Sequence, residues 1–107
     1  MALIQVIDNK ANTTANAFET LFTAGNKGVI IDSFTAANNS KVNASYEAVI
    51  DTGTNETPQI PFKIVVWGEI DLGIGLVNQL IPAGAKLKIK SSAINSIFFT
   101  ITGREVE

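Results

Sequence analysis

The sequence predicts an all-β protein, an antiparallel β-sandwich of the jelly-roll type with about eight short strands. Short runs of alternating apolar and polar residues recur along the 107 residues, and Gly, Asn and Pro separate them. No long run has the spacing of an amphipathic helix. Two antiparallel sheets packed face to face are the simplest arrangement in which such strands each bury one face.

The first part of the chain predicts three strands between polar loops. Residues 3–7 alternate apolar and polar and predict a strand, and the Asn- and Thr-rich residues 9–16 predict a loop. Residues 17–23 also predict a strand, although their apolar residues have the spacing of a helical turn as well. The β-branched residues of 29–34 favour a central strand, and 36–40 predict the turn that follows it.

The middle of the chain has the clearest alternation. Residues 42–50 predict a strand with one apolar face, and 51–58 predict the most exposed loop. Residues 62–67 predict the next strand, with Pro61 at its start, where a missing N–H costs least. The residues of 42–50 expected in the core are Val42, Ala44, Tyr46, Ala48 and Ile50.

The last part predicts short segments joined by turns at 73–75 and 82–84. These segments are 70–72, which we expect at a sheet edge, 76–81, 86–90 and 96–102. In 86–90 the three lysines share one face of the strand, and Leu87 and Ile89 share the other. The lysine face is expected either to be solvated or to block pairing at a sheet edge.

Composition limits the class of protein. The length predicts a single domain over 1–107, with 1–8 and 104–107 as possible interaction arms. A net charge of −2 without a large basic cluster argues against nucleic acid as a partner. The N-terminus has neither a basic region nor a long apolar run, so we expect no signal peptide and no membrane partner. Only 17% of residues are charged, which suggests that part of the surface is covered in the functional state.

The residue types give little support for catalysis. The sequence has no His and no Cys, and so lacks the commonest general base and every thiolate ligand. The pairs Glu69/Asp71 and Glu47/Asp51 have the spacing of a carboxylate dyad or a hard-cation site, but acidic residues beside turns are usually solvated. We therefore predict no enzyme, and no catalytic residue, cofactor or metal site.

Several short motifs occur in an order found in a known group of proteins. They are ETLFTA at 19–24, VIIDSF at 29–34, ANNS at 37–40, IPAGAKL at 81–87 and TITGREV at 100–106. This order resembles small β-sandwich structural proteins of tailed bacteriophages, in which an LYT segment, a strand ending in N-S, a PAG-x-x-L turn and a closing G-x-E strand recur. The motifs span most of the chain and include no catalytic residue.

The resemblance implies a structural protein of the virion, made in the host bacterial cytoplasm. The first expectation is a capsid decoration (cement) protein that binds the outer capsid surface as a homo-oligomer and stabilises the shell. Its partners would be copies of itself and the major capsid protein or other virion proteins. A neck, tail or spike-base adaptor is the alternative. The residues that we expect at an interface are Leu3, Ile4, Val6, Trp67, Ile74 and Leu76.

A hypothesis from another class is a carbohydrate-binding, lectin-like module. Tyr46 and Trp67 would stack on a sugar, and acidic loop residues would contact it with or without calcium.

Overall fold

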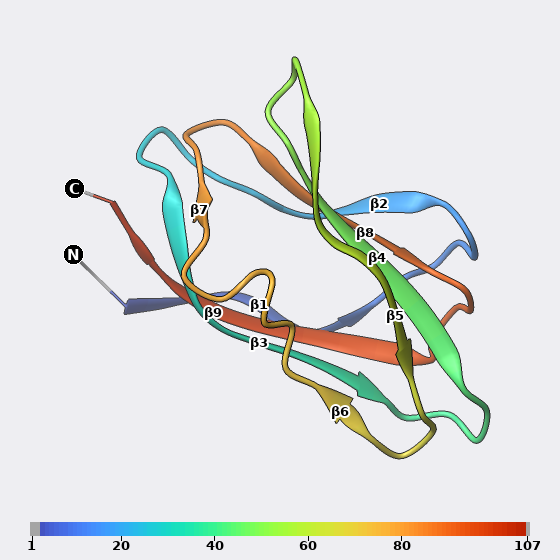
Figure 1. The fold of residues 1–107 in the computed structure, drawn as a ribbon. Coiled ribbons are helices and arrows are strands. Elements are labelled where there is room, and N and C mark those ends of the chain that lie inside the picture. Colours follow the sequence, from blue (N-terminus) through green and yellow to red (C-terminus); the bar gives the residue numbers. More distant parts are fainter. Residues whose placement is uncertain (1–2, 107) are drawn as a thin grey trace.

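The protein is built of β-strands in two layers (Figure 1). The structure, a computed structural model, describes residues 3–106, except for the side chains of 3–6, 8 and 9. Nine strands occur in these residues. They are β1 (Leu3–Ala11), β2 (Phe18–Thr23), β3 (Val29–Asn38), β4 (Ala44–Asp51), β5 (Glu56–Val65), β6 (Ile70–Asp71), β7 (Leu80–Ile81), β8 (Lys86–Ser91) and β9 (Ile97–Glu105).

The strand order is that of a jelly roll. One sheet has the order β1-β9-β3-β6, with β7 also paired to β3, and the other has the order β2-β8-β4-β5. All of these pairs are antiparallel. From β1 to β4 successive strands alternate between the sheets, β4 and β5 form a hairpin in the second sheet, and β6 and β7 both pair with β3 in the first, as in a jelly roll. The predicted fold class is confirmed, and the segment predicted at 76–81 is a strand only over β7.

The core lies between the sheets and follows from the alternation along β3, β4, β8 and β9. Leu87 and Ile89 are fully buried, as are the aromatic rings of Phe34, Tyr46 and Phe99. Tyr46 and Phe99 have ring centroids 5.4 Å apart, and Phe34 lies 5.9 Å from each. This cluster bridges the two sheets, because Phe34 and Phe99 come from one and Tyr46 from the other.

The predicted strand bounds need correction at several places. Residues 9–11, predicted as the start of a loop, continue β1, in which Lys10 and Ala11 pair with β9. Residues 36–38 belong to β3 and not to a turn, because they pair with Phe99, Phe98 and Ile97 of β9. Val42 is exposed and precedes β4, although the other four residues predicted for this core face are buried. The loop predicted at 51–58 is shorter, since β5 already begins at Glu56, which pairs with Asp51.

The lysine face of β8 is on the outside of the second sheet. β8 lies between β2 and β4, so the edge-blocking interpretation is wrong. Lys88 Nζ lies 2.7 Å from an Asp51 carboxylate oxygen, and Lys90 Nζ lies 3.4 Å from one of Glu47. The bond to Lys88 lowers the pKa of Asp51 below its ordinary value. Glu47 and Asp51 are therefore bound by separate lysines and do not form a dyad.

The segments expected as arms are strand residues. Leu3 pairs with Arg104 and Ile4 with Gly103, so residues 3–8 and 104–105 belong to the first sheet. Residues 1, 2 and 107 lie outside the described part of the chain.

Candidate interaction surface

One side of the sandwich carries a row of exposed apolar side chains. β5 ends the second sheet and β6 ends the first, and a short loop joins them on the same side of the molecule (Figure 1). We call this row the apolar edge. Its members are the exposed large apolar residues from β5 to the turn after β6: Phe62, Ile64, Val66, Trp67, Ile70, Leu72 and Ile74.

The apolar edge is continuous across the two sheets. A shallow groove of about 280 Å³ brings Ile64 of β5 and Val66, just after β5, beside Ile70 of β6. Three charged residues, Lys63, Glu69 and Asp71, also line it. A second hollow brings Ile74 beside Pro61 and Lys63. On the outer face of the second sheet, Phe62 and Ile64 line a further hollow with Ser45 and Ser92. These hollows connect Phe62, Ile64, Val66, Ile70 and Ile74, and Trp67 and Leu72 are neighbours of these residues in the chain.

Two glycines place Ile74 at the outermost point of this surface. A Cβ on Gly73 would lie 2.1 Å from the ring of Phe34, and one on Gly75 would lie 2.2 Å from the carbonyl oxygen of Gln59. The backbone of the 73–75 turn can lie this close to the core and to β5 only because both residues lack a side chain. Ile74, between them, points outward and is 88% exposed.

Asp71 ties β6 to the opposite sheet. The hydroxyl of Tyr46 donates a hydrogen bond of 2.5 Å to Asp71 Oδ2, and the Gly73 N–H donates one of 3.2 Å to the same oxygen. Lys63 Nζ lies 3.8 Å from Asp71 Oδ1. Burial raises the pKa of the Tyr46 phenol above its ordinary value, and the hydrogen bond to Asp71 raises it further. Tyr46 thus stays a proton donor, and the bond joins the layers beneath the apolar edge.

Asn38 holds the loop that carries Trp67. Its side-chain amide is buried and donates 2.9 Å hydrogen bonds to the carbonyls of Val65 and Val42, and its Oδ1 accepts from Ser40. The Asn38 backbone also exchanges hydrogen bonds with Gly68 and Glu69. Asn43 Oδ1 also accepts a 3.1 Å hydrogen bond from the backbone N–H of Trp67. The backbone that carries the exposed indole is therefore fixed by hydrogen bonds.

The residues predicted at an interface fall into three groups. Trp67 and Ile74 are exposed on the apolar edge. Leu76 is fully buried in the core, so its inclusion as an interface residue is wrong. The Leu76 N–H donates to the Gly73 carbonyl at 2.9 Å, and this turn directs the side chain inward. Leu3, Ile4 and Val6 lie in β1 of the first sheet, and their side chains are outside the described residues.

Sequence reasoning missed five members of this surface. Phe62, Ile64, Val66, Ile70 and Leu72 are exposed, although apolar residues in a strand are expected in the core. A signal was available in Pro58 and Pro61, because proline within a strand favours an edge position. Ile70 and Asp71 do lie at a sheet edge, as predicted for 70–72, and Leu72 follows the strand.

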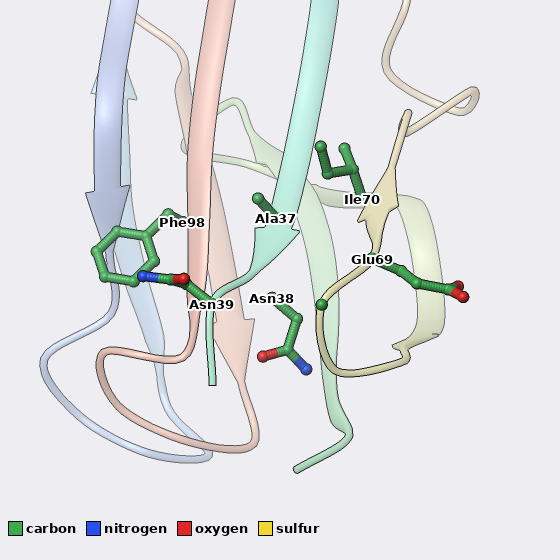
Figure 2. A pocket seen from close by; sticks show the side chains of 7 residues that line it. Ala37, Asn38, Asn39, Glu69, Ile70 and Phe98 are labelled. Atoms are coloured by element: carbon green, nitrogen blue, oxygen red, sulfur yellow. The ribbon is translucent and has the colours of Figure 1, made fainter. Parts of the chain in front are cut away.

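A hollow of about 300 Å³ lies at one end of the surface (Figure 2). Ala37, Asn39, Phe98 and Ile70 are among the residues that line it. Figure 2 shows the carboxylate of Glu69 directed away from the other labelled side chains. Glu69 and Asp71 thus form no dyad, since Asp71 is bound to Tyr46 and Lys63. The described residues hold no cluster of three or more His, Cys, Asp or Glu suited to a metal ion.

Comparison of the chain with protein-family models, with curated proteins and with solved structures finds no match. Within residues 3–106, no helix has the length and apolar character needed to cross a membrane.

Proposed function

We propose that this chain is a structural protein of a tailed-bacteriophage virion, and specifically a decoration protein that binds the outer capsid surface as a homo-oligomer. The apolar edge is the observation that carries the proposal. Apolar patches of several hundred Å² are uncommon on soluble monomers and mark interaction surfaces. The order of short motifs along the chain supports the phage class.

The mechanism is mechanical. A stiff two-layer body, joined across its layers by the Phe34, Tyr46 and Phe99 rings, presents a preformed apolar surface. Because this surface is preformed, copies of the chain lose little conformational entropy when they join through it. Copies joined in an oligomer bind a repeating shell at several points, so the combined attachment is tight even where each contact is weak. Attachment across subunit boundaries would then hold the shell together.

The lectin hypothesis loses one of its two aromatic residues. Tyr46 is fully buried and its hydroxyl is bound to Asp71, so it cannot stack on a sugar. Trp67 remains exposed, but among the described residues no metal-binding acidic cluster accompanies it. The apolar edge favours a protein partner, since its exposed residues are predominantly aliphatic.

The test is the composition and imaging of purified particles. Virions of the phage that encodes this chain are purified on density gradients, their proteins are identified by mass spectrometry, and the particles are imaged by electron cryomicroscopy. We expect the chain in many copies on the outer capsid surface. Its absence from particles, when it is present in the infected cell, would overturn the virion role. Density only at the neck or tail would overturn the decoration role and favour an adaptor.

A matched pair of variants tests the surface. Particles assembled without the chain are incubated with purified wild type, with Ile74→Asp, or with Ile94→Asp as a control at an exposed site in the turn between β8 and β9. We expect Ile94→Asp to bind as wild type does and Ile74→Asp to bind weakly, because copies that do not join through the apolar edge attach to the shell at a single point. Equal binding of the two variants would show that the apolar edge is not used.

A further inference from the structure

We propose that the apolar edge is covered by a second copy of this chain, packed against it about a two-fold axis through side chains. This inference rests on the proposed function, which requires a homo-oligomer, and it names the surface that forms the oligomer. Four features of the surface support a second copy: its area, its self-complementarity under a two-fold rotation, its charges, and the prolines along its backbone edge.

The area of the apolar edge is that of one side of a typical interface. Its seven residues are between 42% and 88% exposed. At roughly 100 Å² of exposed surface for each, they offer on the order of 700 Å² in all. Specific protein–protein interfaces of standard size bury about 800 Å² on each partner. One copy docked on this surface would therefore cover most of it.

A two-fold axis lets the surface cover itself. In such a contact the same patch is used by both copies, so no second complementary patch is needed. Elsewhere on the described residues, exposed large apolar side chains such as Phe18, Leu80 and Ile94 lie on separate elements. None of them offers a surface of comparable extent, and a head-to-tail contact would need one.

The charges within the surface are compatible with a second copy. Lys63 is half-exposed and only 3.8 Å from Asp71, and Glu69 is exposed in the loop between β5 and β6. A two-fold rotation can set the lysine of each copy against the acidic residues of the other. Pairing of opposite charges at the rim favours one register of docking over others.

The backbone edge of β5 favours contact through side chains and not through an added strand. Pro58 and Pro61 have no N–H to donate, and Lys63 adds an exposed charge to the same strand. Prolines and lysines on an edge strand discourage pairing with another strand. The apolar side chains of Phe62 and Ile64 are the part of β5 left to make the contact, and Val66 follows directly after the strand.

The test uses the purified full chain in solution. Sedimentation equilibrium gives the association constant of wild type, Ile64→Asp and Ile94→Asp. The two altered side chains are 55% and 50% exposed and thus comparable. We expect wild type and Ile94→Asp to form dimers with similar association constants. The association constant of Ile64→Asp should be lower by a factor on the order of a hundred or more, because each dimer contains the substitution twice. Far-UV circular dichroism shows whether each variant is folded.

A second measurement needs no variant. Trp67 is the single tryptophan of the chain and lies on the apolar edge. On dilution of the wild type, acrylamide quenching of its fluorescence should rise as dimers dissociate. Any of three results would overturn this inference. The first is a wild type that is monomeric at every concentration, and the second is a trimer or larger ring. The third is a dimer in which Ile64→Asp has no effect and Trp67 stays quenchable.

The outcome is separable from that of the proposed function. A monomeric chain that is found on capsids would overturn the dimer and leave the virion role. A dimer formed through the apolar edge by a chain absent from particles would overturn the virion role alone.

Discussion

Replacing Gly73 by Ala tests the packing that sets the position of the apolar edge. The new Cβ would lie 2.1 Å from Phe34 Cδ1 and 2.7 Å from Cε1, well inside van der Waals contact. The Phe34 ring cannot turn away, because it is buried between Tyr46 and Phe99. Overpacking of this kind costs about 1–3 kcal/mol. The backbone at Gly73 has φ of +54°, which adds about 1–2 kcal/mol for a residue with a Cβ.

We therefore expect Gly73→Ala to lower the free energy of unfolding by about 2–5 kcal/mol. Gly84→Ala is the control, since Gly84 has φ of +77° and no atom within 4 Å of an added Cβ. It should lose only the conformational part, about 1–2 kcal/mol. Urea unfolding followed by far-UV circular dichroism measures both values. Equal losses in the two variants would refute the close contact between the 73–75 turn and Phe34.

Three further substitutions test other parts of the frame. Tyr46→Phe keeps the ring but removes the hydrogen bond to Asp71. In urea titrations it should lower the free energy of unfolding by about 1.5–3 kcal/mol. A loss near zero would show that the bond does not stabilise β6. Asn38→Asp replaces a buried amide that donates to two carbonyls with a carboxylate that repels them. It should lower the free energy of unfolding by about 3 kcal/mol or more at neutral pH, seen as a lower thermal midpoint than that of Asn38→Ala. A milder effect than that of Asn38→Ala would contradict this account. The N–H of Thr14, with further hydrogen bonds from Thr13, lowers the pKa of Glu19 below its ordinary 4.5. The stabilisation by Glu19 is thus complete above that pH and is lost as the pH falls through the lower folded-state pKa. In urea midpoints measured over a pH series, the advantage of wild type over Glu19→Gln should shrink in acid, and a constant advantage would count against the assignment.

The sequence predicts best where one local pattern determines the outcome. In 42–50, period-two alternation correctly placed Ala44, Tyr46, Ala48 and Ile50 in the core, since a strand turns successive side chains to opposite faces. The turn at 82–84 is confirmed, and Gly84 there has the positive φ that glycine permits. The jelly-roll class follows from such strands taken together, because few arrangements bury one face of each.

The exposed surface depends on tertiary pairing, which no local pattern contains. Phe62 and Ile64 are exposed because β5 is an edge strand, and its place in the order β2-β8-β4-β5 is set by partners far along the chain. The different exposure of Ile74 and Leu76 also could not be predicted from a local pattern. An extended chain would place both on one side, but the turn between Gly73 and Leu76 leaves one exposed and buries the other.

The pairing of the first strand with the last has a consequence for how the molecule is made. β9 is the central partner of both β1 and β3, so the first sheet cannot close until β9 has left the ribosome. A fold dominated by such distant pairings also forms slowly, in milliseconds to seconds for domains of about this size. Ribosome-bound chains that stop before Ile97 should therefore remain sensitive to protease, with resistance gained abruptly once Glu105 emerges.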